Sequence, residues 1–189
     1  NPAWSSRKRM SELISLYEAI NDGGTEVVRL DLETPSSDRK PNSQYADIFP
    51  DEDGMELVRE AYHKGHFVLV SGELPVNRKD GGSEGLGRYE MVLRKVADEE
   101  AAEAHFYRDQ ISLPLVNNKA PLYPGVSSLL MIRGGDSNPL CQMLRQSEGP
   151  AHLFWDRNEH RLKQYHYGPS TIAFLKEIGK QLIVSFNTT

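Results

Sequence analysis

A pair of strand-like segments joined by a turn constrains the fold of this chain more than any other feature. Residues 66–76, HFVLVSGELPV, and residues 87–97, GRYEMVLRKVA, have the extended, largely alternating character of β-strands. The intervening residues include NRKDGG, which supplies the Asn, Asp and Gly that favour a tight reversal. The two segments are therefore expected to pair as an antiparallel hairpin in the middle of the chain.

Further strands and helices are predicted on both sides of this hairpin. Strand-like segments lie at residues 25–32 and 104–112, and residues 126–133 form a largely apolar run typical of a strand covered on both faces. Apolar spacings of three and four predict helices at residues 5–20, 54–63, 137–147 and 169–178. The apolar stripe of the first helix consists of Met10, Leu13, Ile14, Tyr17 and Ile20.

These elements predict an α+β fold, with a mostly antiparallel sheet and helices packed on one face. Residues 1–65 are expected to hold an N-terminal helix, a strand and a long surface loop, and residues 66–189 one compact α+β unit. The loop is inferred from residues 33–53, which are rich in Pro, Ser, Asp and Asn and show no periodicity. A chain of 189 residues can bury a core without disulfides or metals.

Composition narrows the class of protein. The net charge of −5 and the pI near 5.7 argue against a protein whose main task is to grip a phosphate backbone, although they are compatible with a local basic patch. The single cysteine, Cys141, cannot form an internal disulfide, which favours a reducing, cytoplasmic setting. No apolar run approaches the roughly 18 residues needed to span a bilayer, so no membrane partner is expected.

Residues 147–155, SEGPAHLFW, join a stiff turn to an apolar run and carry the first candidates for a site. Glu148 and His152 lie in the turn, which Pro150 stiffens. The Leu-Phe-Trp run at residues 153–155 is expected to anchor a corner of the core, because aromatic side chains bury large apolar areas. The loop before it is then a candidate to complete the site of a partner domain.

A metal site is an alternative interpretation of the same region. His152, Asp156 and His160 have the spacing of one helix face, and Glu159 and His166 lie nearby. Such a cluster would suit a small metal-dependent hydrolase or nuclease. The Gly-Pro pair before His152 argues against a continuous helix, and no His-Glu-x-x-His or Cys-x-x-Cys motif supports the site.

A module that binds a protein or a nucleic acid is the third interpretation. Arg78, Lys79 and Arg88 border the predicted hairpin and are interleaved with Tyr89. Basic residues with aromatic neighbours favour contacts with phosphates and bases. Alternating charges on the outer face of a strand are, however, the commoner reason for this pattern.

Taken in order, the motifs resemble a known family. They run across residues 66–178 as SGELPVNRKDG, GRYEMVLRK, HFYRDQISLP, GVSSLLMIRGG, LRQSEGPAHLFW and YHYGPSTIAFLK. The series resembles the region after the ATP-binding domain of large bacterial GHKL-type ATPases, the broad group of gyrase, the heat-shock chaperone ATPases and MutL. Many of these bacterial proteins are uncharacterised, and some are associated with phage-defence gene clusters. The most specific parts are Ser147 to Trp155 and the Tyr-Gly-Pro-Ser/Thr helix start.

The resemblance implies a transducer, or middle, domain in which helices back a sheet. In the family, ATP and magnesium bind a separate N-terminal domain, and a transducer loop contributes a Lys or Arg toward the γ-phosphate. Nothing here matches the acidic-Asn and Gly-rich boxes of that domain. The resemblance therefore implies a non-catalytic chain that binds no cofactor alone and has an ATP-binding domain as partner. Its phosphate-facing candidates are Arg145 and Lys119.

Overall fold

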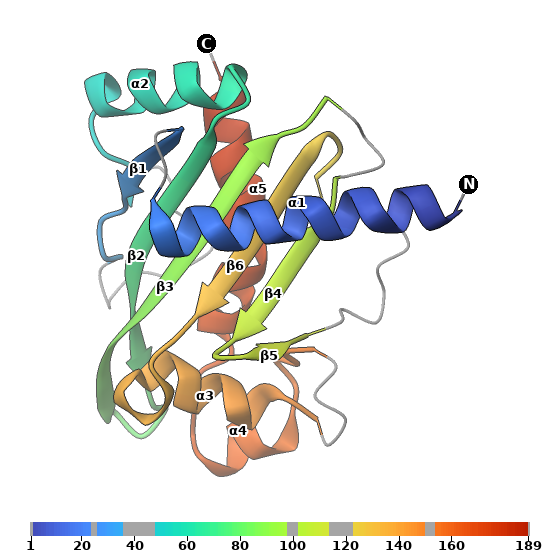
Figure 1. Ribbon diagram of the computed structural model, residues 1–189. Coiled ribbons are helices and arrows are strands. Elements are labelled where there is room, and N and C mark those ends of the chain that lie inside the picture. Colours follow the sequence, from blue (N-terminus) through green and yellow to red (C-terminus); the bar gives the residue numbers. More distant parts are fainter. Residues whose placement is uncertain are drawn as a thin grey trace.

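The predicted hairpin forms the centre of the structure (Figure 1). The computed structural model describes residues 2–23, 26–35, 48–97, 102–113, 123–149 and 154–188. Strands β2 (Phe67–Asn77) and β3 (Ser83–Lys95) pair antiparallel along nearly their whole length. The hairpin predicted from the alternating segments is therefore confirmed.

Six strands form one sheet in the order β1-β2-β3-β6-β4-β5. The strands beside the hairpin are β1 (Val27–Asp31), β4 (Ala104–Arg108), β5 (Ile111–Ser112) and β6 (Val126–Ile132). The pairs β2–β3, β3–β6 and β4–β5 are antiparallel, whereas β1–β2 and β6–β4 are parallel. The sheet is therefore mixed and largely antiparallel, and the α+β class predicted from the sequence is confirmed.

The place of β4 differs from the expected order of strands. The sequence predicts a strand at residues 104–112 in a mostly antiparallel sheet, but β4 lies beyond β6 and runs parallel to it. All seven residues of β6 are buried, so this strand needs cover on both faces and a neighbour on both edges. It therefore occupies the interior of the sheet and separates β4 from β3.

One face of the sheet is covered by α2 (Glu52–His63), α3 (Pro139–Ser147) and α5 (Ser170–Asn187), with the short α4 (His160–Gln164) beside α3. The start of α3 is well specified. The Asn138 side chain accepts the backbone N–H of Leu140 at 3.0 Å, and Pro139 occupies the first helical position. Residues 160–164 form α4, although no helix is predicted there from the sequence.

Helix α1 (Pro2–Asp22) crosses the opposite face (Figure 1). Helices therefore cover both sides of the sheet, and the expectation that they pack on one face is wrong. Leu16, Ala19 and Ile20 form the side of α1 that packs on the apolar side chains of β2, β3 and β6. The apolar stripe seen in the sequence shares only Ile20 and the partly buried Leu13 with this side. Its members Met10, Ile14 and Tyr17 are exposed to solvent.

Residues before and after position 65 contribute to the same sheet. β1 pairs with β2 along its five residues, and both α1 and α2 pack on later strands. Part of the predicted surface loop, residues 36–47, lies outside the described residues. None of the described helices combines the length and the apolar character that a membrane crossing requires.

Candidate functional site

A turn of two glycines follows β6 at the edge of the sheet where the carboxyl ends of β4 and β6 meet. Gly134 and Gly135 have φ angles of 116° and 51°, a region that other residues rarely adopt. Both backbone N–H groups donate to Asp109 Oδ1, at 3.2 and 3.0 Å. The turn is therefore held by a carboxylate, which occupies the N–H groups that an anionic ligand would otherwise use.

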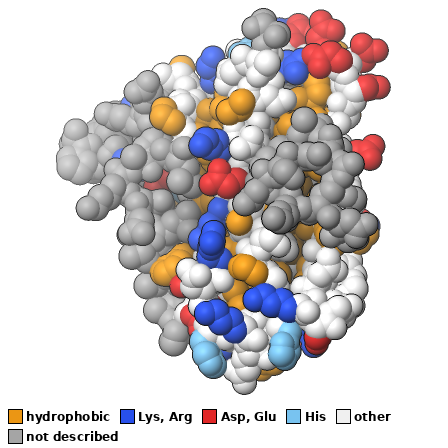
Figure 2. Space-filling model, turned by 180° about the vertical axis from the view of Figure 1, so that it is seen from behind, with side chains coloured by type: hydrophobic (Ala, Val, Ile, Leu, Met, Phe, Trp, Pro, Cys, Tyr) orange, Lys and Arg blue, Asp and Glu red, His pale blue; other side chains and the backbone are white. Residues whose placement is uncertain are grey.

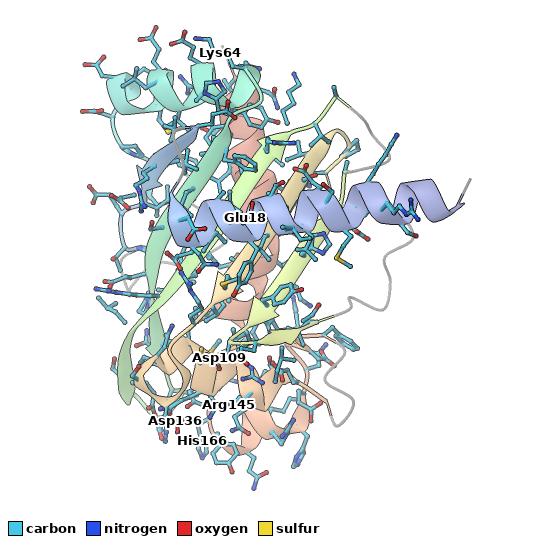
Figure 3. All side chains as sticks on the ribbon, viewed as in Figure 1. Glu18, Lys64, Asp109, Asp136, Arg145 and His166 are labelled. Atoms are coloured by element: carbon cyan, nitrogen blue, oxygen red, sulfur yellow. The ribbon has the colours of Figure 1, made fainter. Side chains whose placement is uncertain are left out.

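Arg145, a phosphate-facing candidate from the sequence, lies beside this turn with Asp109 and Asp136 (Figure 3). Its Nη1 is 2.5 Å from Asp136 Oδ1, and its Nη2 is 3.9 Å from Asp109 Oδ2. The Arg145 side chain is 40% exposed, so two carboxylates orient a guanidinium that still reaches solvent. This arrangement is a preoriented cation at the protein surface. Lys119, the other candidate, lies outside the described residues.

A buried ion pair lies just inside this charged surface. Arg108 Nε donates to Glu148 Oε1 at 2.6 Å, and Arg108 Nη2 donates to Oε2 at 2.9 Å. The Arg108 side chain is 5% exposed and that of Glu148 is 0% exposed. Hydrogen bonding to Glu148 is the main cause that raises the pKa of Arg108, so the guanidinium stays charged despite its burial. The bidentate geometry satisfies both charges in the core.

These contacts define the role of the SEGPAHLFW segment. Trp155 is fully buried, as the sequence predicts, and its indole N–H donates to Glu148 Oε1 at 3.3 Å. Glu148 and Trp155 also form a β-bridge, and Arg161 donates to the backbone carbonyl of Glu148. Phe154 is 39% exposed, so the expectation that it anchors the core is wrong, and Leu153 lies outside the described residues. Glu148 is thus a structural partner of Arg108 and does not face solvent.

The metal alternative depends on the cluster from His152 to His166. His152 lies outside the described residues. Asp156 Oδ1 accepts the backbone N–H of Asn158 at 2.8 Å, and His160 begins α4. Within the part of the chain that the structure describes, no three His, Cys, Asp or Glu side chains are grouped so as to hold a metal ion. The described residues therefore contain no assembled set of metal ligands that would support the metal-dependent hydrolase alternative.

Arg78 and Arg88 do not lie on one basic surface, and the exposed Lys79 follows Arg78 directly after β2. Arg78 pairs with Glu84 and lies over the ring of Tyr167, 5.4 Å from its centroid, and that ring belongs to the core on the α5 side of the sheet. Arg88 lines a cleft on the α1 side and pairs with a glutamate of β2. Figure 2 shows Lys and Arg side chains down the α5 face, interrupted by acidic ones. The predicted basic hairpin is thus divided between two faces.

The cleft on the α1 side has a volume of about 580 Å³ and extends to Gly134. Arg88 Nε donates to Glu73 Oε1 at 2.8 Å, and Arg133 Nε donates to Glu90 Oε2 at 3.1 Å. Both arginines that line the cleft therefore have carboxylate partners from the same cleft. The cleft is polar but its positive charge is already neutralised, which disfavours an anionic ligand.

Cys141 is buried in α3 next to the charged end of the sheet. Its Sγ lies 3.7 Å from Asp109 Oδ1 and 3.6 Å from the backbone carbonyl of Ile132. Burial, reinforced by the negative charge of Asp109, raises the pKa of the Cys141 thiol to about 11. A thiol with so high a pKa is protonated at neutral pH, which disfavours it as a nucleophile.

The sequence singled out Arg145 but not Arg108 or Asp109. A signal was present, because Arg108-Asp109 ends the aromatic strand HFYRD, and Glu148 is the lone acid between α3 and an apolar run. Charged residues in such settings are buried only with partners. Comparisons with known proteins found no match among family models, curated proteins or solved structures.

Proposed function

We propose that this chain is the non-catalytic transducer, or middle, domain of a cytoplasmic GHKL-type ATPase, which couples the nucleotide state of a separate ATP-binding domain to a partner or effector. The observation that carries the proposal is the position of Arg145, a partly exposed guanidinium that two carboxylates orient at the edge of the sheet. The ordered motifs that resemble the family lead to the same residue. A hairpin-built sheet with β6 in its interior is compatible with this role.

In this role Arg145 supplies positive charge to a nucleotide that the other domain binds. Negative charge on the γ-phosphate oxygens is stabilised by a preorganised guanidinium during phosphoryl transfer. The two carboxylates beside Arg145 differ in a useful way. Asp136 is 83% exposed, so its ion pair is weak and a phosphate can replace it. Asp109 is held by the Gly134-Gly135 turn, and its Oδ2 lies 3.9 Å from Arg145 Nη2.

The two alternatives have less support. The side chains of Arg78 and Arg88 are paired with glutamates on opposite sides of the sheet, so the described residues present no continuous basic surface around the hairpin. The described part of the His152–His166 region assembles no metal ligand set. Arg145 is in contrast oriented and still open to solvent.

The test is ATP turnover by the natural protein that contains this chain together with its ATP-binding domain. Arg145→Ala is expected to lower kcat by about 100-fold or more, because removal of one preorganised donor has an effect of this order. The affinity for ATP should change little. Arg145→Lys should retain part of the turnover, since lysine keeps the charge but loses the planar fork.

Arg88→Ala is the matched control, because it removes an exposed arginine that lies in the cleft on the α1 side. Turnover of this variant should equal that of the wild type, and equal turnover of Arg88→Ala and Arg145→Ala would contradict the proposal. The gene provides a second test. Its reading frame, or that of a polypeptide that copurifies with this chain, should encode the acidic-Asn and Gly-rich boxes of an ATP-binding domain. A complex without such a domain and without ATP turnover would overturn the proposal.

A further inference from the structure

Helix α1 exposes an apolar stripe on the side that faces away from the sheet. Met10, Ile14 and Tyr17 are 57%, 50% and 51% exposed. The other large exposed apolar side chains among the described residues are spread singly over α2, β3, β5, α5 and the segments around α4. Figure 1 shows that no described element lies over the outward side of α1. An apolar surface concentrated on one helix is a typical feature of a docking face.

The charges of α1 are arranged against the dipole of the helix. Arg7 lies near its N-terminal end, and Glu18 and Asp22 lie near its C-terminal end, whereas the dipole favours the opposite order. All three side chains are exposed, and none forms an ion pair with another described residue. This order destabilises a helix that stands alone. It becomes favourable when a second α1 lies alongside in the opposite direction, because each basic end then meets an acidic end.

We propose that two copies of this chain associate through α1, as an antiparallel pair about a two-fold axis near Ile14. Positions 7, 10, 14 and 17 follow one side of a helix. In an antiparallel pair, Met10 of one copy therefore packs against Tyr17 of the other, and the Ile14 side chains meet near the axis. Arg7 of each copy then lies beside Glu18 of the other, and the same occurs at both ends of the contact.

The acidic end of α1 has room for the arginine of a second copy. A hollow of about 400 Å³ lies beside the C-terminal half of the helix, and Glu18, Asp22 and Glu26 line it together with Arg94. The carboxylates outnumber the one cation, so the hollow complements the Arg7 guanidinium in both charge and space. A second copy of this chain, rather than an acidic or neutral partner, supplies that cation.

The size of the stripe sets the expected strength. Stable dimers bury about 800 Å² per partner, and three half-exposed apolar side chains with flanking charges provide less. The dimer is therefore weak, with a dissociation constant of about 10–100 µM in low salt. Higher salt should weaken it further, since the Arg7–Glu18 contacts lie at the rim and are screened.

Sedimentation velocity on the full chain tests this proposal. Over about a hundredfold increase in concentration, the wild type should change from a monomer to a dimer. Arg7→Glu and Glu18→Arg should each raise the dissociation constant by about tenfold or more, and the double variant with both changes should restore it, because opposite charges face each other again. Ile14→Glu should abolish the dimer. Leu57→Glu, which alters an exposed apolar residue of α2, is the control and should leave it unchanged.

Three results would overturn the dimer proposal. A wild type that stays monomeric at the highest concentration overturns the proposal. A dimer that survives Ile14→Glu, or a charge-swapped double variant as weak as the single variants, assigns the contact to another surface and overturns it as well. Far-UV circular dichroism checks that the variants are folded, and full helicity is expected because the substituted side chains point to solvent.

Discussion

Replacing Glu148 by alanine removes both acceptors of the bidentate pair and leaves the Arg108 guanidinium, which is 5% exposed, without its main partner. Breaking one side of a buried pair costs about 3–5 kcal/mol. The Trp155 indole N–H also loses its acceptor. Asp109 Oδ2 is 3.4 Å from Arg108 Nη1 and offsets part of the loss. We therefore expect Glu148→Ala to lower the unfolding free energy by about 3–5 kcal/mol.

Urea unfolding, followed by circular dichroism and tryptophan fluorescence, measures this loss. With a slope of about 1–3 kcal/mol per molar urea, the midpoint should fall by roughly 1–5 M. Glu73→Ala is the matched control, because it removes a glutamate from a pair with an arginine that is 82% exposed. That change should cost about 1 kcal/mol or less. Glu148→Gln keeps an acceptor for Trp155 and should fall between the two.

Equal losses for Glu148→Ala and Glu73→Ala would refute the reasoning, since they would mean that Arg108 is solvated in solution. A double variant, Arg108→Met with Glu148→Leu, examines the same pair from the other side. Apolar residues of similar volume often replace a buried ion pair at little cost. The double variant should therefore be more stable than Glu148→Ala, and a double variant of equal or lower stability would show that the loss comes from packing.

Three further predictions concern other parts of the core. Gly87→Ala places a methyl group 2.6 Å from Leu140 Cβ and 2.8 Å from Leu140 N, so α3 must shift and the unfolding free energy measured in urea should fall by about 1–3 kcal/mol. Burial raises the pKa of Glu12, and the charge of Arg94 offsets only part of the rise. The Glu12 carboxyl thus holds its proton more tightly in the folded chain than in the unfolded one. The stability that this protonation contributes is lost as the pH rises through the raised pKa. The unfolding free energy of the wild type minus that of Glu12→Gln should therefore fall as the pH rises past the ordinary pKa range of a glutamate, and a flat or rising difference would count against a buried carboxyl. The Cys141 thiol, with a pKa raised to about 11, should react with a thiol reagent only as fast as the chain unfolds, so rapid labelling in native buffer would contradict its burial.

Elements with a strong local pattern could be predicted from the sequence. Alternation specifies the hairpin, an unbroken apolar run specifies β6, and spacings of three and four specify α2, α3 and α5. The neighbours of each strand could not be predicted in this way. β4 pairs with β6 and not with β3, and no local pattern in residues 104–112 specifies that neighbour.

The orientation of α1 could not be predicted because apolar residues lie on more than one side of this helix. Two sets of positions have helical spacing: Leu16, Ala19 and Ile20, and the stripe that includes Met10 and Tyr17. The first set faces the sheet, where the small Ala19 allows a close approach to the strands. A periodic pattern identifies a helix but does not by itself identify the side that is buried when both sides are apolar.

The same limit applies to the site. Arg145 was singled out only through the family resemblance and its place after the core strand, so its role toward a phosphate stays a prediction. The pair of Arg108 with Glu148 joins residues 40 positions apart, and it exists only because β4 lies next to β6, whose chain continues into α3. Both the arrangement of the sheet and the buried charge pair depend on the order of the strands, which local sequence patterns do not specify. Lys119 and His152 lie outside the described residues, so their predicted roles stay predictions.

The two proposed surfaces lie in different parts of the molecule, which makes their tests independent. Glu18 lies on α1 across the middle of the sheet, whereas Arg145 lies with Asp109 and Asp136 beyond the strand ends (Figure 3). An antiparallel pair of α1 helices therefore does not need the edge at which a nucleotide-binding domain would meet Arg145. If the chain is monomeric and ATP turnover depends on Arg145, only the dimer proposal is overturned. If the chain dimerises but the natural protein turns over ATP equally well after Arg145→Ala, only the transducer proposal is overturned.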